Sequence, residues 1–210
     1  MKKRFKKLVS IGLVAVMAFS LAACTSGSDS SSSSEEKETS AGSGKIGVAM
    51  PTKDLQRWNQ DGENMKKQLE EAGYEVDLQY ASNDVATQVS QIENMISGDC
   101  DALVIASIDG ESLGTSLKEA EEKGIPVISY DRLIMNSSAI SYYATFDNYL
   151  VGQKQGEYIV EALDLDNADG PFNMEIFTGD PGDNNCNFFF GGAMDVLQPY
   201  IDAGKLVVQS

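Results

Sequence analysis

The chain has 210 residues, no histidine and a formal net charge of −16 at pH 7. The lack of histidine excludes Ser-His-Asp and Cys-His catalysis, and the acidic charge makes nucleic acid and anionic lipid surfaces poor partners, because phosphate binding needs clustered basic residues. The three cysteines are too few and too scattered for a disulfide framework or a zinc site, so we expect Cys100 and Cys186 to be free thiols.

The N-terminus has the pattern of a secretory signal. A basic head precedes an apolar run over residues 8–22, which is too short for a permanent membrane-spanning helix. The run ends in Leu21-Ala22-Ala23-Cys24, which resembles the lipobox of bacterial lipoproteins; the alternative is an ordinary signal peptide whose cysteine is incidental. We predict a signal peptide over 1–23, followed over 24–44 by a lipidated (palmitoylated) Cys24 and a disordered linker rich in Ser, Gly and Glu.

From Lys45 onward, short apolar runs alternate with helical periods. The pattern predicts strands over 45–50, 75–80, 102–106 and 126–130, separated by helices that end at Gly73, Gly98 and Gly124. Regularly spaced strands with helices between them are consecutive βαβ units. They predict an α/β fold with a doubly wound parallel sheet.

The alternation of predicted strands and helices continues beyond residue 141. We expect strands over 142–146 and 173–178, a helix whose Gly152 and Gly156 let a neighbour approach closely, and a helix that Pro199 bends and Gly204 ends. A last strand begins at residue 205, and the sequence stops inside it. No partner strand or covering helix follows, so we expect the fold to be incomplete at this end.

Ligands of open parallel sheets bind beyond the carboxyl ends of the strands. The glycines of "GSGKIG" precede the first strand, no GxxxxGK[ST] occurs, and "DLDNADG" lacks an oxygen ligand at Ala168, so we expect no nucleotide, no other cofactor and no metal. Polar or aromatic residues at the predicted strand ends are Arg57, Trp58, Asn83, Asp84, Ser107, Asp109, Asp131, Arg132, Asp147, Asn148, Asp183, Asn184 and Asn185.

Arginine, carboxylate, carboxamide and tryptophan together suit a small polyhydroxylated ligand. Carboxylates and guanidinium groups can hold neighbouring hydroxyls, and an aromatic face can cover the C–H patch of a sugar ring. Other interpretations stay open. Trp58 shares a helical face with apolar residues and can be core, Asp131 and Arg132 can form a local salt bridge, and residues 183–185 can be a turn with a helix cap. Arg57 in the first turn of a helix opposes the macrodipole, so we expect a compensating contact.

Several segments carry a family resemblance. From Lys45 onward, "RWNQDG", "QIENMI", "ALVIASIDG", "PVISYDRLI", "YYATFDN" and "DNN" resemble bacterial solute-binding proteins of the type I periplasmic fold, in the xylose and multiple-sugar-binding subfamily. The resemblance implies two α/β lobes that close over one aldose of the xylose, galactose, glucose or arabinose type and deliver it to an ABC permease. The ligand-binding residues that it implies are Arg57, Trp58, Asp131, Arg132, Asp183 and Asn185, with Lys53 and Asp147 near matching positions.

The resemblance also frames the alternatives. A sensory binding protein of the same fold would present its ligand to a chemoreceptor or histidine kinase, and the sequence does not separate it from an importer. A repressor or an enzyme fits less well, because the chain begins with an export signal and lacks catalytic motifs. We expect a lipid-anchored protein outside the cytoplasm. Family members are longer, so the resemblance implies an N-terminal lobe over 45–146 that is mostly present and the start of a second, incomplete lobe over 147–210. We therefore expect sugar binding by these 210 residues to be weak or absent.

Overall fold

The computed structural model describes residues 42–209. The predicted signal peptide, Cys24 and all but the end of the predicted linker lie outside the described residues. Across residues 42–209, none of the helices combines the length and apolar character needed to cross a membrane.

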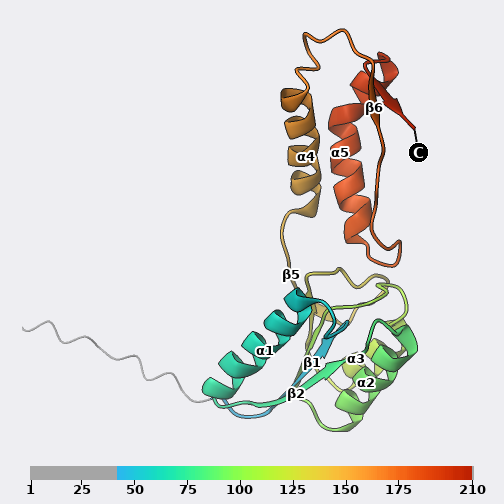
Figure 1. Ribbon diagram of the computed structural model, residues 1–210. Helices are drawn as coiled ribbons and strands as arrows, with labels where there is room; N and C mark the ends of the chain where they lie inside the picture. The colour runs from blue at the N-terminus through green and yellow to red at the C-terminus, as the bar shows by residue number, and fades with distance from the viewer. Residues whose placement is uncertain (1–41, 210) are drawn as a thin grey trace, which may run out of the picture. The chain divides into compact units, whose positions relative to one another are not determined.

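The first part of the described chain forms a five-stranded sheet in the order β2-β1-β3-β4-β5, in which every neighbouring pair is parallel (Figure 1). This confirms the predicted α/β fold with a parallel sheet. The elements are β1 (Lys45–Met50), α1 (Gln56–Glu71), β2 (Glu75–Tyr80), α2 (Val85–Ser97), β3 (Ala102–Ile105), α3 (Gly114–Glu122), β4 (Val127–Tyr130) and β5 (Ile140–Ala144).

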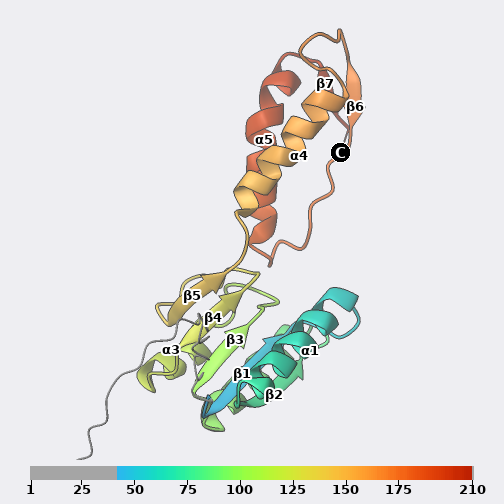
Figure 2. The same ribbon diagram turned by 90° about the vertical axis from the view of Figure 1, so that its left-hand side faces the viewer.

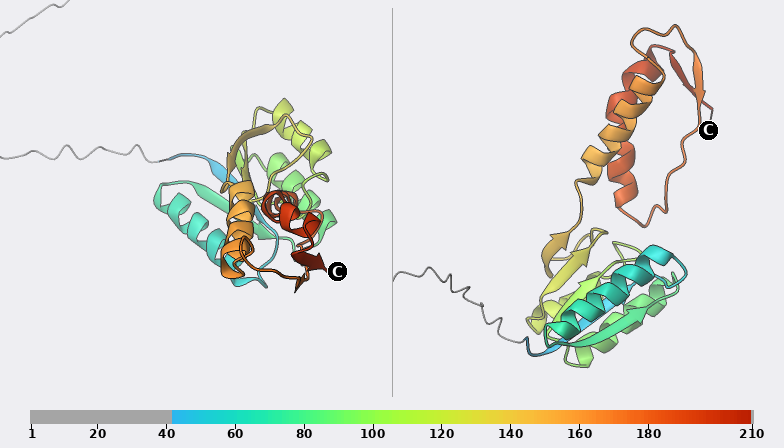
Figure 3. Two further views of the ribbon diagram at one scale, coloured as in Figure 1. Left: turned by 90° about the horizontal axis from the view of Figure 1, so that it is seen from above. Right: turned by 60° about the vertical axis from the view of Figure 1, so that its left-hand side comes forward.

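Side chains alternate between the two faces of the central strands, so each strand contributes to two cores. Val48 and Met50 of β1 pack with Trp58 of α1, whereas Ala49 packs with Ile92 of α2 and other residues of α2 and α3. Helix α1 therefore covers one face of the sheet, and α2 with α3 covers the other (Figure 2; Figure 3). This packing brings the carboxyl ends of the strands to one edge.

Three strands of this sheet have boundaries that differ from the prediction: β3 ends at Ile105, β4 begins at Val127, and β5 runs from Ile140 to Ala144. The strand expected over 142–146 is β5, which ends at Ala144, because its partner β4 ends at Tyr130 and Asp131 turns away in the left-handed region with φ 63°. Gly98 is the C-cap of α2, as predicted, and the left-handed residue follows it. Gly98 has φ −88°, and Asp99 takes the left-handed position with φ 57°. An aspartate tolerates this conformation because its short polar side chain can bond locally.

The remaining elements pack around a hydrophobic cluster of their own. They are α4 (Asn148–Ala162), β6 (Phe172–Met174), α5 (Asn185–Asp202) and β7 (Leu206–Val208), with β6 and β7 parallel. Leu165, Leu197 and Leu206 are its fully buried apolar residues. The predicted division into lobes over 45–146 and 147–210 stays a prediction.

Helices α4 and α5 lie side by side (Figure 1) because glycines line their contact. A Cβ on Gly152 would meet the carbonyl oxygen of Phe189, and one on Gly156 would lie 2.8 Å from the Cβ of Val196. The predicted close approach at Gly152 and Gly156 is thus confirmed. Helix α5 continues through Pro199 and changes direction in its last turns, as the proline ring predicts.

The strand expected over 173–178 is much shorter. Only Phe172–Met174 is paired, with Leu206–Val208 of β7, and residues 175–178 have no strand partner among residues 42–209. A strand is defined by its ladder of hydrogen bonds to a neighbour, so an apolar alternating sequence without a neighbour stays irregular.

Candidate ligand-binding site

Six of the eight predicted ligand-binding residues line one cavity at the carboxyl edge of the sheet. The cavity has a volume of about 240 Å³. Its walls are Arg57, Trp58, Asp131, Arg132, Asp183 and Asn185, together with Phe146, Asn148 and Phe189. A second hollow of about 380 Å³ shares Arg57, Asp131 and Phe146 with it.

Arg57 finds the compensating contact that its position in α1 requires. Its guanidinium donates a hydrogen bond to the carboxylate of Asp131, and its Nε lies 3.4 Å from Oδ2 of Asp61, one turn along the helix. Burial acts to lower the pKa of Arg57, but the hydrogen bond to Asp131 and the charge of the two carboxylates outweigh it and raise the pKa. The two acidic partners thus offset the unfavourable helix dipole.

Trp58 is both a core residue and a wall of the cavity. Only 4% of it is exposed, and it packs against Val48 and Met50 on the α1 face of the sheet. The guanidinium carbons of Arg57 and Arg132 lie 4.6 Å and 5.2 Å from its ring centroid, within the range of cation–π attraction. The core interpretation of Trp58 therefore holds without excluding a role at the site.

Arg132 pairs across the site, and a local salt bridge between Asp131 and Arg132 does not form. Its Nη1 donates to the carbonyl oxygen of Ser107 at 3.1 Å, and its Nε lies 2.9 Å from Oδ2 of Asp183. The Nε–H group does not point at this oxygen, so the contact with Asp183 is an ion pair without a hydrogen bond. Because Arg132 pairs with the carboxylate of Asp183, the carboxylate of Asp131 is available to pair with Arg57.

The backbone of Asp131 is held from several sides. Its N–H donates to the carbonyl of Ala144 at 2.8 Å, and its own carbonyl oxygen accepts from Thr145 Oγ1 at 2.9 Å, from Tyr143 Oη at 3.2 Å and from Asn185 Nδ2 at 3.2 Å. Burial raises the pKa of Tyr143, so its hydroxyl keeps its proton at neutral pH. These bonds fix a left-handed residue and so fix the direction of its carboxylate.

Residues 183–185 form a turn, and Asp183 and Asn185 also face the cavity. Oδ1 of Asp183 accepts from the backbone N–H of Asn185 at 3.0 Å, which is the predicted turn, while the N-cap residue Asn184 makes no side-chain capping bond. Asn185 is 6% exposed, and its Oδ1 accepts from Asn148 Nδ2 at 2.8 Å.

Lys53 and Asp147 lie outside the cavity. Lys53 is exposed, with Nζ 3.9 Å from Glu63 Oε1 and 4.8 Å from the ring centroid of Tyr80. Asp147 caps α4 by accepting from the N–H of Leu150 at 2.9 Å. The structure does not bring these two side chains to the other six.

The other strand-end residues have local roles. Asp84 accepts from the N–H of Thr87 and caps α2, and Asp109 accepts from the N–H groups of Glu111 and Ser112. Ser107 is buried, and its hydroxyl has no hydrogen-bond partner within residues 42–209. Both cysteines are free thiols, as predicted. Cys100 is buried and Cys186 donates to the carbonyl of Asp180 at 3.2 Å.

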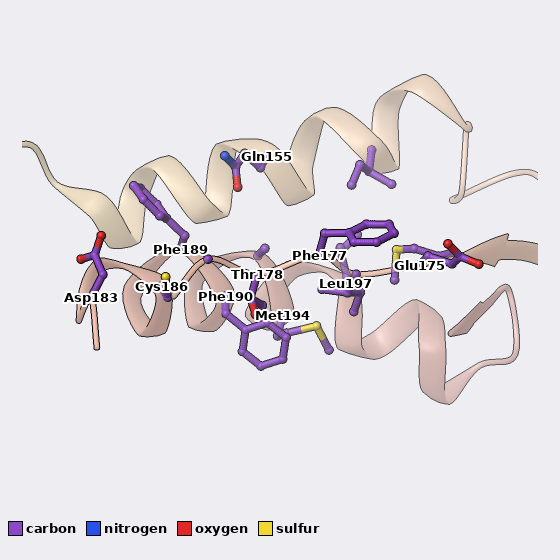
Figure 4. Close-up of a pocket in the computed structure, with 15 residues that line it drawn as sticks. Gln155, Glu175, Phe177, Thr178, Asp183, Cys186, Phe189, Phe190, Met194 and Leu197 are labelled. Atoms are coloured by element: carbon purple, nitrogen blue, oxygen red, sulfur yellow. The ribbon is translucent and has the colours of Figure 1, made fainter. Parts of the chain in front are cut away.

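A larger cavity of about 500 Å³ lies between α4, α5 and residues 174–179 (Figure 4). Phe177, Phe190, Met194 and Leu197 give it a mainly apolar wall. Asp183 and Glu175 lie toward opposite ends of the close-up. Polar groups that fix the orientation of a hydroxylated ligand must converge on it, so the smaller cavity is the better candidate site.

A parallel α/β sheet with guanidinium, carboxylate, carboxamide and indole groups gathered at its carboxyl edge defines a class of proteins that bind small polar molecules. Within that class, the chain belongs to the family described as "Periplasmic binding protein domain", whose family model matches residues 46–209.

Several members of the family are close relatives. An ABC transporter solute-binding protein from Clostridium phytofermentans, solved with bound β-D-glucose, is 76% identical with a TM-score of 0.77, over 79% of this chain and 51% of that chain. The multiple sugar-binding periplasmic protein SbpA of Azospirillum brasilense is 55% identical over 165 residues, which are 79% of this chain and 46% of the relative. The D-xylose-binding periplasmic protein of Escherichia coli is 40% identical over 164 residues, 78% of this chain and 48% of the relative. The chain spans about half the length of the curated relatives it matches.

Proposed function

We propose that this protein is the substrate-binding component of an ABC-type sugar importer and that it binds an aldose monosaccharide without turning it over. The observation that carries the proposal is the convergence of Arg57, Trp58, Asp131, Arg132, Asp183 and Asn185 on one cavity. Relatives named for multiple sugars and for D-xylose, and a solved relative with bound glucose, support the aldose class.

The chemistry of these groups suits vicinal hydroxyls. Each hydroxyl both donates and accepts, and the cavity offers carboxylate acceptors on Asp131 and Asp183 beside guanidinium donors on Arg57 and Arg132. Because each carboxylate already faces an arginine, the groups are held in place before a ligand arrives. A site preorganised in this way rejects ligands that lack the hydroxyls, because their polar partners would stay unpaired.

The location of the protein follows from the same proposal. The relatives are periplasmic proteins by name, and the predicted export signal places this protein outside the cytoplasm. We propose that Cys24 carries a lipid that holds it at the membrane and that an ABC permease receives the sugar. Incorporation of labelled palmitate that is lost in Cys24→Ser tests the anchor.

Calorimetric titration with D-glucose, D-galactose, D-xylose and L-arabinose tests the function. At least one aldose should bind at a single site, with the weak affinity expected of these 210 residues, and 2-deoxy-D-glucose should bind at least about tenfold more weakly than glucose. Asp131→Asn is the matched test variant and should bind more weakly than the wild type. Asparagine keeps the size of the side chain and tolerates the left-handed backbone of residue 131, but it loses the charge. Equal binding by wild type and Asp131→Asn, or conversion of the sugar to a product, would refute the proposal.

A further inference from the structure

A closed ring of hydrogen bonds connects the end of β4 with the first residues of α4 and α5. Thr145 Oγ1 donates to the carbonyl oxygen of Asp131 at 2.9 Å, and Asn148 Nδ2 donates to Thr145 Oγ1 at 3.3 Å and to Asn185 Oδ1 at 2.8 Å. Asn185 Nδ2 closes the ring on the carbonyl oxygen of Asp131 at 3.2 Å. Asn148 is the first residue of α4, Asn185 is the first residue of α5, and both are 6% exposed.

Only one assignment of donors and acceptors fits the ring of hydrogen bonds. A backbone carbonyl oxygen can only accept hydrogen bonds. Thr145 must therefore donate its single hydroxyl hydrogen to the carbonyl oxygen of Asp131, and Asn185 must turn its amide nitrogen toward the same oxygen. Thr145 then offers only lone pairs to Asn148, and Asn185 offers only its oxygen. Tyr143 Oη lies 3.4 Å from Asn185 Oδ1, but its single hydrogen can go to the nearer carbonyl oxygen of Asp131 at 3.2 Å. The two hydrogens of the Asn148 amide nitrogen then satisfy Thr145 and Asn185 together.

We infer that Asn148 is a positioning residue that fixes the carboxamide of Asn185 with its nitrogen toward Asp131. Asn185 Nδ2 lies 3.2 Å from the carbonyl oxygen and 3.5 Å from the carboxylate Oδ1 of Asp131. A donor is therefore held beside an acceptor at the wall of the cavity. If the proposed function holds, a sugar hydroxyl can accept from Asn185 and donate to Asp131 at once, and Asn148 acts on the ligand only through Asn185.

The inference makes an aspartate at position 148 unfavourable in a way that depends on pH. A carboxylate there would face two acceptors, Thr145 Oγ1 and Asn185 Oδ1, without a hydrogen to give them, whereas the protonated acid could donate one. The folded protein should therefore raise the pKa of the carboxyl group that Asn148→Asp introduces above its unfolded value. The stability that protonation provides is fully present below the unfolded pKa and is lost as the pH rises through the folded pKa.

Other charges near residue 148 act in both directions. Asp131 and Asp183 line the same cavity and Asp147 precedes it, and all three oppose a further carboxylate. Arg57 and Arg132 line the cavity too, and with the α4 macrodipole they favour a carboxylate. The neighbouring Tyr143 stays neutral because burial raises its pKa. Because these charges act in opposite directions, we expect Asn148→Asp to lose much stability at high pH only if Asn185 turns its oxygen toward residue 148.

The experiment follows thermal unfolding of the wild type, Asn148→Asp and Asn148→Ala from pH 5 to pH 8 without sugar. Relative to Asn148→Ala, which lacks a donor but adds no charge, Asn148→Asp should unfold at least about 4 °C lower at pH 8, and the gap should close toward pH 5. Asn187→Asp in the first turn of α5 is the control, because Asn187 Nδ2 also donates to a carboxamide oxygen, Asn184 Oδ1 at 3.1 Å, but in an exposed position where water can replace the lost donor. It should show no such gap. A flat or reversed difference between the two Asn148 variants would overturn the inference.

A second arm separates this inference from the proposed function. With glucose, Asn148→Asp should weaken binding about tenfold more at pH 8 than at pH 5.5, and Asn148→Ala should weaken it by the same factor at both. If the stability gap appears but the wild type binds no aldose, the positioning role stands and the proposed function fails. Equal pH dependence of binding in both variants would overturn the positioning of Asn185 for the ligand.

Discussion

Replacing Trp58 tests whether one side chain serves both the core and the ligand. The indole is 4% exposed and packs against Val48, Met50, Val104 and Ala106. A buried tryptophan removes about 150–250 Å² of surface from water, which at about 25 cal/mol per Å² corresponds to about 4–6 kcal/mol as an upper bound. Trp58→Ala should therefore lower the free energy of unfolding by about 3–5 kcal/mol, the range typical of such core truncations.

Urea unfolding followed by circular dichroism measures this loss, since the only tryptophan of the chain is the residue removed. Trp58→Leu keeps an apolar side chain on α1 but removes the flat ring that faces Arg57 and Arg132. It should be markedly more stable than Trp58→Ala and still lose most of its affinity for aldoses. A loss of stability below about 1 kcal/mol in Trp58→Ala would refute the core assignment. Unchanged sugar affinity in Trp58→Leu would refute its role at the site.

Two further changes probe the fold. Gly152→Ala should lower the free energy of unfolding by about 1–3 kcal/mol, because its Cβ would meet the carbonyl of Phe189. Gly191→Ala, whose Cβ has no neighbour closer than 3.4 Å, should raise it by about 0.5–1 kcal/mol. Equal effects of the two changes would contradict the packing of α4 on α5. Hydrogen bonds from the N–H of Glu111 and from Ser112 lower the pKa of Asp109, so its stabilisation is present above the unfolded pKa and is lost as the pH falls through the folded one. Asp109→Asn should thus destabilise the protein near pH 7, and the loss should shrink as the pH falls below the unfolded pKa of about 3.9. Thermal melts at pH 7 and in acid would show this, and a constant difference would contradict it.

The layout of the sheet and a set of thirteen strand-end residues could be predicted from local pattern, and the family resemblance selected six of them that line the cavity. Buried runs such as residues 102–106 and helical periods such as that of α2 fix the βαβ order, and parallel strands then bring their carboxyl ends together. Arg57 and Asp131 are 74 positions apart in the sequence and meet for this reason. Their pairing with each other, in place of a local Asp131–Arg132 bridge, depends on side-chain directions that periodicity does not contain.

What the sequence could not predict depends on partners in three dimensions. Residues 175–178 read as strand, but a strand needs a neighbour to pair with. Tyr143 and Thr145 lie in the segment "YYATFDN", but their role is visible only because Asp131 turns its carbonyl toward them. Asn148 did carry a signal, because it lies just beyond the end of β5, but nothing in its spacing distinguishes a positioning residue from a ligand-binding one.

The most direct measurement of the central claim is the NMR resonance of the Trp58 indole N–H during titration with D-glucose. Trp58 is the only tryptophan of the chain and lines the candidate cavity, so this one signal reports on the site even when binding is weak. We predict a saturable shift in the wild type that is absent in Asp131→Asn. An indole signal that does not respond to any of the four aldoses, or that responds equally in Asp131→Asn, would contradict a sugar site at the carboxyl edge of the sheet.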